Sequence, residues 1–512
     1  MAPLLYSYLL TWLLTGAVHA LLECSSRVIT NYNKTNATNM ETNLMWCSTM
    51  MKNHHVIPQK SFGSLSRPDQ INWDRFLCNE LVTRRKYLSC EETLGFTFFS
   101  SWRQDFTPTI QGGSEVSCGA SALGHVACHF KRVILDFSLC SIHGSARRFE
   151  TGFFQTYGRL QSGNANTFMR GHQHSNGNYD SSSCDIIETQ PVFLISHDDI
   201  FNYGHHLNDV FNVWATSKLA FHPQERKVNY SDWKLLIFDA YRTGGPAGFG
   251  RLMDISDPDA LGPFVDLYKS LFGSIIRTVD YSTKKVCFSE LYIPSQHAWV
   301  WNDWTAENTC SKRGPSPLWQ RFNAEIRDAL SRLYGFKSQD ELPAPDPLMV
   351  EIVLLQRKGV PKRGSGARVI ANVDKLVAML KGIGSHVHVT VVDFAGMPFR
   401  QQYLAMQSAN IFISMHGAGG IHVTNMRVGF PNCCASLEFF PPPSIGYASI
   451  HGHGNIARWS GVRYYRYVAA EGQGDESSGT KVDLTEIERI VRSAIKTIAR
   501  NPSCINDNSN AW

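Results

Sequence analysis

Residues 411–426 read Ile-Phe-Ile-Ser-Met-His-Gly-Ala-Gly-Gly-Ile-His-Val-Thr-Asn-Met, an apolar run followed at once by a His-Gly-Ala-Gly-Gly loop. The run at 411–415 is short, rich in isoleucine and bounded by glycine, which predicts a buried strand. Because glycine has no Cβ, the backbone after this strand can approach a ligand closely, and a following helix would present N–H groups and the positive end of its dipole. The loop is therefore either an anion site or an ordinary turn between a strand and a helix.

Strands and helices alternate on both sides of this loop. The predicted strands are residues 350–355, 387–393, 411–415 and 435–440, and the predicted helices are 373–380 and 399–407. An earlier block follows the same pattern, with strands at 192–195, 234–238 and 286–293 and helices at 207–219 and 263–272. Such alternation is typical of parallel sheets covered by helices. The sequence therefore predicts an α/β protein with two Rossmann-like domains.

Changes in composition suggest where these domains begin and end. Residues 21–185 are rich in Cys, Ser and Gly and hold one clear strand at 131–137, so we expect an N-terminal region that packs on the first domain. Residues 186–341 are expected to form the first α/β domain, the proline-rich stretch 342–348 a hinge, and residues 349–470 the second domain.

Composition excludes some classes of function. The chain has 512 residues, of which 43% are hydrophobic and 18% charged, and this predicts a globular protein with more than one domain. The formal net charge is only +5, without a long basic run, so nucleic acid is not expected as a partner. A few well-placed arginines for an anionic small molecule remain compatible with this charge.

The N-terminus and the cysteines indicate a secretory compartment. Residues 1–20 resemble a signal peptide, with an apolar run at 4–14 and small residues for cleavage, although an uncleaved stretch at 4–22 would serve as a membrane anchor. Both alternatives place the rest of the chain in the lumen of the endoplasmic reticulum or Golgi. Thirteen cysteines fit an oxidising environment, and Cys287 with Cys310 is a plausible local disulfide. Asn33, Asn36 and Asn229 lie in N-glycosylation sequons.

Two charged features lie near the ends of predicted strands in the second domain. Arg357 comes two residues after the strand 350–355, and Arg368 follows in the same basic loop. In doubly wound sheets ligands bind beyond the carboxyl ends of the strands, so these cations would meet a diphosphate, unless the loop is simply solvated. Glu438 lies near the end of the strand 435–440 and would accept hydrogen bonds from ribose; alternatively it is a surface residue or the salt-bridge partner of an arginine.

A third feature lies in the first domain, where a helix begins near His205. His205 and Asp209 are four residues apart and share a helix face, and a carboxylate beside an imidazole is a common general-base arrangement. Two alternatives remain open. His205, His206 and Asp209 would ligate zinc, with another histidine such as His416, His422, His451 or His453, or they would form a helix-stabilising cluster without chemistry.

Taken together, four motifs resemble glycosyltransferase family 61. They are Asn-x-x-His-x-x-x-Asp at 202–209, Arg-x-Ile-x-Asn at 368–372, His-Gly-Ala-Gly at 416–419 and Leu-Glu-Phe-Phe-Pro at 437–441, in that order. With the stretches between them, the likeness covers roughly two thirds of the chain, and the segments 184–212 and 286–310 are most similar to the branch that transfers O-GlcNAc to EGF domains.

The resemblance implies a fold and a reaction. It implies a GT-B architecture, in which two Rossmann-like domains face a cleft and a C-terminal helix at 483–500, apolar on one face, returns to the first domain. It also implies inverting transfer of a sugar from a UDP-sugar to a hydroxyl of a protein or glycan, with GlcNAc favoured over xylose or arabinose. No metal or other cofactor is expected beyond the UDP-sugar, and membrane contact only through an uncleaved anchor.

The resemblance further implies roles for individual residues. His205 backed by Asp209 would be the base, with His416 as the competitor. The donor nucleotide would be bound by Arg357, Arg368, Asn372, His416, Gly417, Ala418, Gly419, Gly420 and Glu438. Two other functions remain as alternatives: a lumenal zinc hydrolase using His205, His206 and Asp209, and a catalytically silent module that binds glycan or UDP.

Overall fold

The structure is a computed structural model of the whole chain. It describes residues 103–107, 113–120, 126–137, 141–143, 173–174, 179–195, 202–220, 230–237, 262–281, 284–294, 314–337, 341–342, 346, 348–357, 368–428, 433–445, 452–475 and 478–500. The expected signal segment and the three sequon asparagines lie outside these residues, and the hinge at 342–348 is described only in part, so these stay predictions. No helix of the described residues is long and apolar enough to cross a membrane.

The chain divides into two compact units. Thr97–Phe201 and His205–Trp299 belong to the first unit, whereas Asn202–Gly204 and Val300–Trp512 belong to the second. Residues 300–341, which the sequence assigned to the first domain, therefore lie in the second unit. The reason is helix α10 (Pro317–Leu333), whose buried Trp319 packs on Trp459 and whose Asn323 Nδ2 donates to Ser460 Oγ over 2.8 Å.

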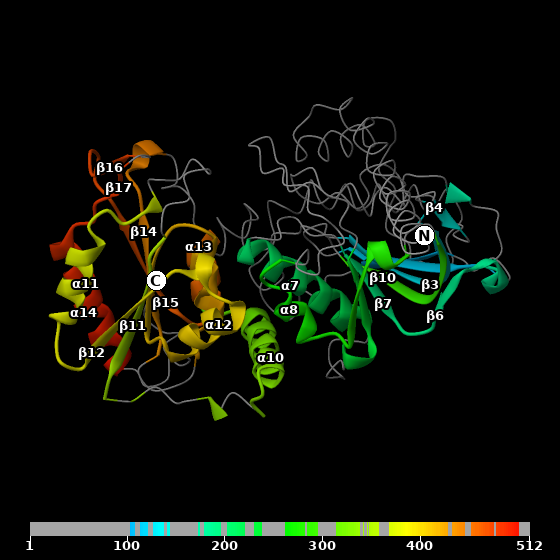
Figure 1. Cartoon of the computed structure of the whole chain (residues 1–512), viewed down its shortest axis with the longest axis horizontal. Helices are drawn as coiled ribbons and strands as arrows, with labels where there is room; N and C mark the ends of the chain where they lie inside the picture. Colours follow the sequence, from blue (N-terminus) through cyan, green and yellow to red (C-terminus); the bar gives the residue numbers. More distant parts are fainter. Residues whose placement is uncertain are drawn as a thin grey trace, which may run out of the picture. The chain divides into compact units, whose positions relative to one another are not determined.

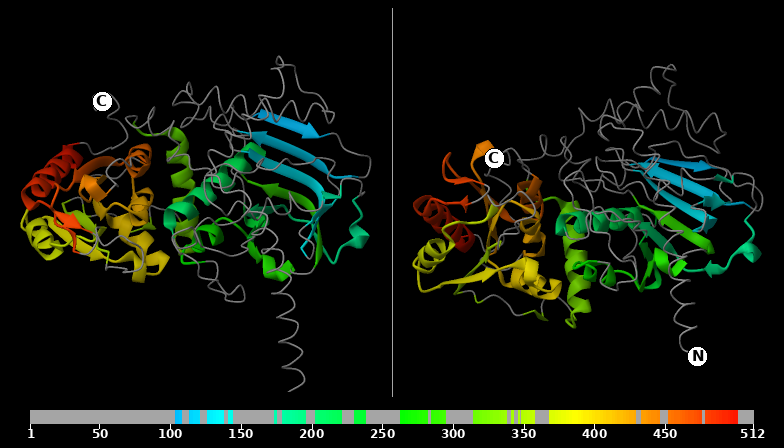
Figure 2. Two further views of the ribbon diagram at one scale, coloured as in Figure 1. Left: turned by 90° about the horizontal axis from the view of Figure 1, so that it is seen from above. Right: turned by 45° about the horizontal axis from the view of Figure 1, so that its top comes forward.

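The described part of the first unit is built on one mixed sheet, in the order β1-β2-β3-β10-β7-β8-β9 (Figure 1). Its strands are β1 (Arg103–Thr107), β2 (Glu115–Ala120), β3 (Val126–Asp136), β4 (Ser141–His143), β5 (Gln173–His174), β6 (Ile186–Glu188), β7 (Val192–Ile195), β8 (Lys234–Ile237), β9 (Ser274–Arg277) and β10 (Lys285–Ile293). Strands β10, β7, β8 and β9 are parallel, as expected, whereas β1, β2 and β3 are antiparallel neighbours (Figure 2). The described part of the N-terminal region thus extends the sheet of the first domain.

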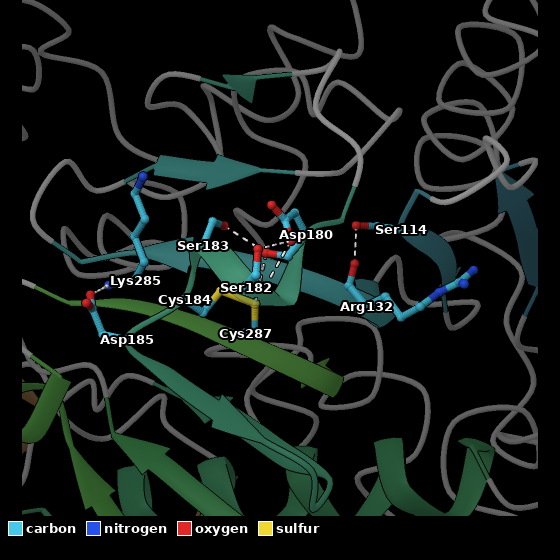
Figure 3. The surroundings of a disulfide bond; sticks show 9 residues. All are labelled: Ser114, Arg132, Asp180, Ser182, Ser183, Cys184, Asp185, Lys285 and Cys287. Atoms are coloured by element: carbon cyan, nitrogen blue, oxygen red, sulfur yellow. Dashed lines mark hydrogen bonds between the residues drawn. A yellow bond between two sulfur atoms is a disulfide. The ribbon is translucent and has the colours of Figure 1, made fainter.

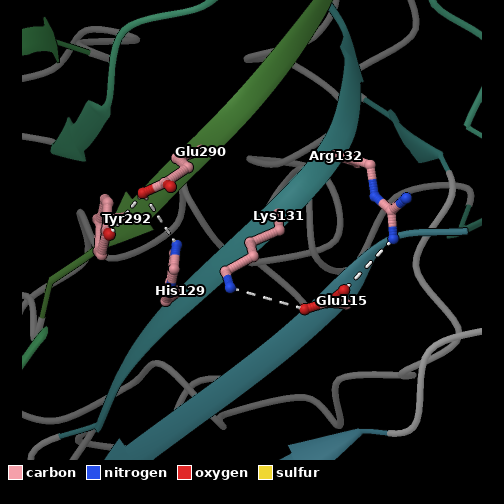
Figure 4. A network of polar contacts seen from close by, with 6 residues as sticks. All are labelled: Glu115, His129, Lys131, Arg132, Glu290 and Tyr292. Carbon is pink, nitrogen blue, oxygen red and sulfur yellow. Dashed lines mark hydrogen bonds and ion pairs between the residues drawn. The ribbon is translucent and has the colours of Figure 1, made fainter.

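Two helices accompany this sheet, α7 (Tyr203–Ala220) and α8 (Asp266–Lys269), together with the 3₁₀ turns η1 (Ser181–Ser183), η2 (Tyr230–Asp232) and η4 (Thr278–Tyr281). The helix expected at 263–272 is shorter than predicted. On the sheet, β2, β3 and β10 carry a ladder of polar side chains (Figure 4). Glu115 pairs with Lys131 and Arg132, and Tyr292 donates to Glu290 over 2.8 Å. The two pairs of Glu115 join neighbouring strands, are largely exposed and add little stability, whereas Glu290 and Tyr292 lie on the same strand and Tyr292 is buried.

The disulfide of Cys287 differs from the expected one. Cys287 is bonded to Cys184, with their Cα atoms 5.8 Å apart (Figure 3). Strand β6 runs parallel to β10 with Ile187 opposite Cys287, so Cys184, just before β6, is brought to the same place. The expected pairing of Cys287 with Cys310 is therefore wrong, and Cys310 lies outside the described residues.

The second unit contains a fully parallel five-stranded sheet in the order β12-β11-β13-β14-β15 (Figure 1). Its strands are β11 (Val350–Leu355), β12 (Val387–Val392), β13 (Ile411–Met415), β14 (Ala435–Phe440) and β15 (Arg463–Val468). Strands β13 and β14 are buried along their whole length, which explains why most of their residues are apolar. The sheet confirms the predicted α/β class; β15, rich in tyrosine and arginine, was not predicted.

Helices cover both faces of this sheet. Besides α10, they are α11 (Val373–Lys381), α12 (Phe399–Ser408), α13 (Gly452–Trp459) and α14 (Leu484–Arg500), with the 3₁₀ segments η7 (Phe394–Gly396), η8 (Ala418–Asn425) and η9 (Pro443–Ile445). Helices α11 and α14 lie on one face, and α12 and α13 on the other (Figure 1).

Helix α14 packs within the second unit, and its expected return to the first domain stays a prediction. Its apolar residues Ile487, Val491 and Ile498 are buried in one core with Leu376 and Leu380 of α11. This apolar stripe packs on α11 and on the sheet of the same unit. Asp483 caps the helix, since its Oδ1 accepts from the backbone N–H of Thr485 over 2.9 Å.

The segment after β13 is anchored in the core by His422. This side chain is 1% exposed and stacks on Tyr203 with ring centroids 4.0 Å apart. Asn425 Nδ2 donates to His422 Nδ1 over 3.3 Å, and Tyr203 donates to Asn425 Oδ1 over 3.0 Å. Burial lowers the pKa of His422 to about 3, so the ring is neutral near pH 7. Its contacts with Tyr203 and Asn425 give it a structural role.

We predict that Cys184→Ser frees the thiol of Cys287, whereas Cys310→Ser leaves it blocked. Peptide mapping of the alkylated, non-reduced protein measures this, and the wild type should yield a peptide pair joined through Cys184 and Cys287. Loss of this cross-link should lower the free energy of unfolding by about 2–4 kcal/mol. A pair joined through Cys287 and Cys310 would restore the pairing expected from sequence.

We also predict an acid-sensitive stability that originates at His422. Its folded pKa of about 3 lies below the ordinary 6.5, so the unfolded state binds a proton first as the pH falls. Stability is therefore complete above pH 6.5 and is lost below it, by about 1.4 kcal/mol per pH unit down to the folded pKa. His422→Phe should remove this dependence between pH 6.5 and 5 in denaturant titrations, while His386→Phe, at an exposed position, should keep it. Equal pH dependence in both variants would contradict the assignment.

Candidate functional site

The order of the second sheet marks one place for a ligand. In chain order its strands run 2-1-3-4-5, so β11 and β13 are neighbours whose connections lead to opposite faces. The connection after β11 leads to α11, whereas the one after β13 leads to η8, which contacts α12 and α13. In doubly wound sheets ligands bind beyond the carboxyl ends of the strands at such a switch point. Arg357 follows β11 there, and His416 and Gly417 follow β13.

Gly417 brings two arginines together. Its φ is 151°, in a region that L side chains rarely adopt. A Cβ on this residue would lie 3.1 Å from Arg357 Nη1 and 3.3 Å from Arg368 Nη1, so both guanidinium groups border the same backbone position. Arg357 and Arg368 are partly buried. Two like charges at one point repel each other, and an anion bound there would offset that repulsion.

The other glycines of the loop have a different task. A Cβ on Gly419 would collide with Leu355 Cδ2, and one on Gly420 would lie 3.2 Å from His453 Nδ1. These two residues let η8 pack closely on the last residue of β11 and on α13. The segment is a 3₁₀ helix, and the N–H of Gly420 already donates to the carbonyl of Gly417 over 2.8 Å. Close approach to a ligand is thus supported at Gly417 rather than along the whole loop.

Glu438 is buried in the middle of a hydrogen-bonded cluster. Its Oε1 accepts from His416 Nδ1 and from His453 Nδ1, both over 2.8 Å, and its Oε2 accepts from Tyr464 over 2.6 Å. The rings of His416 and His453 stack with centroids 4.6 Å apart, and His416 also stacks on Phe440. Residues of β14, α13 and β15, all in the second unit, therefore hold the side chain of His416, which follows β13.

The cluster fixes the protonation of its members. Burial opposes ionisation of Glu438, but the electrostatic attraction and the hydrogen bonds of the His453 and His416 rings outweigh it and hold the pKa of this carboxyl well below its usual range. Burial keeps the pKa of His416 below its ordinary value, although its hydrogen bond to Glu438 opposes this shift. Near pH 7 His416 is thus a neutral imidazole with the proton on Nδ1, and the lone pair lies on Nε2.

The same cluster is the one group of His, Cys, Asp and Glu among the described residues that is spaced to hold a metal ion. Its geometry fits hydrogen bonds better. Both His–Glu distances are 2.8 Å, whereas ligand atoms around a tetrahedral zinc ion lie about 3.3 Å apart. Cations also surround it: Arg368 lowers the pKa of His416, and Arg458 acts on Glu438. Such surroundings favour an anion over a divalent cation.

The candidate site residues of the first unit all lie on one helix, α7. His205 is partly exposed and Asp209 is buried, one turn apart on α7. His206 is fully buried and packs edge-on against Phe264 with ring centroids 5.4 Å apart. His205, His206 and Asp209 do not form a group spaced for a metal, so the zinc alternative built on them is not favoured.

Two members of the site were not predicted from sequence as such. His453 was considered only as a possible metal ligand, and Tyr464 was not considered. The glycines around His453 are the signal that sequence offered: a Cβ on Gly454 would lie 2.8 Å from Tyr464 Cε1, so α13 needs glycine there to approach β15. Asn372, expected at the nucleotide, instead donates through Nδ2 to the carbonyl of Val482 over 2.9 Å.

Comparison with known proteins supports the earlier resemblance. A family model described as Glycosyltransferase 61 matches residues 203–431, a stretch that includes α7, Arg357, Arg368 and the loop after β13. Similar proteins are EGF domain-specific O-linked N-acetylglucosamine transferases. The protein of Drosophila melanogaster is 23% identical over 286 residues, covering 56% of this chain and 46% of its own length.

Two vertebrate relatives agree. The protein of Mus musculus is 26% identical over 270 residues (51% of this chain and 42% of its own), and that of Gallus gallus 24% identical over 341 residues (62% and 56%). The chain thus spans about half the length of the curated relatives it matches. Residues 203–431, which include the switch-point site and the two arginines at Gly417, are therefore similar to glycosyltransferase family 61.

Proposed function

We propose that the protein is an inverting glycosyltransferase that moves a sugar from a UDP-sugar to a hydroxyl of a protein. The observation that carries this proposal is the pair of arginines at Gly417, at the switch point of a parallel sheet. GlcNAc is the favoured sugar and an EGF-like domain the favoured acceptor, because the similar proteins act on these. A disulfide and a signal-like N-terminus support an acceptor in the secretory pathway.

The leaving diphosphate would lie against Gly417. Arg357 and Arg368 would donate to its oxygens, because both guanidinium groups border the backbone of Gly417. Guanidinium groups bind phosphate oxygens through two parallel hydrogen bonds and stay charged at all relevant pH values. Fixed positive charge at the leaving group stabilises the transition state most, because charge develops there as the sugar leaves. We therefore propose that no metal cofactor is needed.

His416 would lie beside this diphosphate, with its ring held by Glu438. As a neutral imidazole with a lone pair on Nε2, it would accept a hydrogen bond from a hydroxyl of the donor. Glu438 acts through His416 in this proposal, because its two oxygens already accept from three side chains. A direct contact of Glu438 with ribose stays a prediction.

The base would be His205 oriented by Asp209, with His416 as the competitor. Both first-unit residues lie on α7, within the residues that match the family. We further propose that the two α/β units are the two domains of a GT-B enzyme, which is supported by the parallel strands in each. A silent module that binds UDP without turnover is the remaining alternative. The transfer assay of the Asp209 variant below distinguishes it from an active enzyme.

Arg357→Ala should weaken UDP binding about ten- to a hundredfold, since a charge-assisted hydrogen bond contributes about 1.5–3 kcal/mol. Arg357→Lys should lie in between, because it keeps the charge and loses the paired donors. Isothermal titration with UDP measures both, with Arg489→Ala as the control at an exposed position of α14. Equal affinities in Arg357→Ala and the control would remove the diphosphate from this place.

Asp209→Asn should lower sugar transfer by about 10²–10⁴-fold and leave UDP affinity unchanged, because general-base catalysis contributes about that much and the nucleotide is bound elsewhere. Transfer from UDP-GlcNAc to a folded EGF-like domain gives the rate, and Asp232→Asn, at an exposed aspartate, is the matched control. Loss of UDP binding with an intact fold would make Asp209 part of the donor site. Absence of any turnover by the wild type would favour the silent module.

A further inference from the structure

The segment that carries Arg368 is hydrogen-bonded to a hairpin that comes much later in the sequence. The hairpin consists of β16 (Gly474–Asp475) and β17 (Gly479–Thr480). Thr480 N–H donates to the carbonyl of Val369, and Ala371 N–H donates to the carbonyl of Thr480, both over 2.8 Å. Ile370 between them is 2% exposed and belongs to the core of the second unit. The backbone immediately after Arg368 is thus fixed on both sides of a buried residue.

Asn372, two residues after Ile370, makes a further contact between the same two segments. Its Nδ2 donates to the carbonyl of Val482, and the N–H of Val482 donates to its Oδ1, both over 2.9 Å. The amide side chain thus mimics a backbone pair and binds the chain that follows β17. In the Arg-x-Ile-x-Asn motif, Ile370 and Asn372 therefore hold the segment, and Arg368 is the member that reaches Gly417. We call these contacts of 369–372 with 479–482 the clasp.

Glycine is required at the centre of the clasp. Gly479 has a φ of 80°, and a Cβ there would lie 2.7 Å from the carbonyl oxygen of Val369. A side chain would push this carbonyl away and break its hydrogen bond from Thr480. Gly472, also beside the hairpin, has nearly the same φ of 79°, but a Cβ there would meet nothing within 4 Å. The two glycines therefore differ in contact and not in backbone conformation.

The hairpin is itself fixed to the sheet. Lys481 N–H donates to the carbonyl of Gln473 over 2.7 Å. The Tyr467 hydroxyl, at the end of β15, donates to Gln473 Oε1 over 3.3 Å and accepts from the N–H of Asp483 over 2.9 Å. Strand β15 thus holds the hairpin, and the hairpin holds the segment of Arg368.

We propose that the clasp sets the position of the Arg368 guanidinium and so the affinity of the site for a nucleoside diphosphate, with Gly479 and Asn372 as positioning residues. The inference rests on the proposed function. A flexible arginine loses rotamer and backbone freedom when it binds phosphate, and a segment that is already fixed loses less. The clasp also gives the carboxamide of Asn372 a structural task.

The test compares Gly479→Ala with Gly472→Ala. Both variants carry the same strain from a positive φ, but only the first displaces Val369. Isothermal titration with UDP, well below both melting temperatures, should show about a tenfold weaker Kd for Gly479→Ala and an unchanged Kd for Gly472→Ala. Asn372→Asp gives a second route, because it puts a carboxylate oxygen against the carbonyl of Val482 and should weaken UDP similarly if Gly479→Ala does not fold.

A double-mutant cycle decides whether the effect passes through Arg368. In the Arg368→Ala background, Gly479→Ala or Asn372→Asp should cost no further UDP affinity, since the arginine that they position is gone. Additive losses in this cycle, or equal losses in Gly479→Ala and Gly472→Ala, would overturn the clasp and leave the proposed function intact. Absence of UDP binding by the wild type would overturn both.

Discussion

At Gly417 the backbone leaves β13 with φ 151° and ψ 175°, a conformation that essentially only glycine adopts, and the rest of the site depends on this turn. On one side it leaves His416 directed at Glu438 of the neighbouring strand. On the other it leaves a surface without a Cβ, where the guanidinium groups of Arg357 and Arg368 meet. Any side chain at 417 would displace both arginines and strain the turn. One backbone conformation thus joins the cationic part of the site to its hydrogen-bonded part.

The buried cluster behind the turn explains why the cations are held so close together. Glu438 is ionised and supplies one negative charge, shared by His416, His453 and Tyr464, at a place where Arg368 and Arg458 exert their fields. Because the cluster is buried, these charges are only weakly screened by salt. An anionic ligand such as a diphosphate would complement the positive charge of the two guanidinium groups at Gly417.

Sequence reasoning succeeded where one segment carried its own signal. The buried strands 350–355, 411–415 and 435–440 were predicted with their observed bounds, since short and mainly apolar runs leave little ambiguity. Arg357 and Arg368 followed from the rule that parallel strands present their carboxyl ends at one edge. Sequence reasoning failed where an element depends on pairing with another segment. Strand β15 is half polar, and Cys184 is 103 residues from its partner Cys287.

The glycine loop shows a subtler limit. Three glycines in four residues were taken as one device for approaching a ligand, but Gly419 and Gly420 are needed to pack against Leu355 and His453. Composition cannot separate these tasks, because both require the same missing Cβ.

The choice of arginine also bears on how the site responds to pH. Arg357 and Arg368 keep their charge throughout the physiological range, so the attraction for a diphosphate does not change with their protonation. His416 is different, because burial and Glu438 act on its pKa in opposite directions. Protonation of His416 would convert Nε2 from an acceptor into a donor and add a third cation beside Gly417. In the proposed enzyme, binding of the diphosphate and acceptance of a donor hydroxyl would then respond to acid with opposite signs.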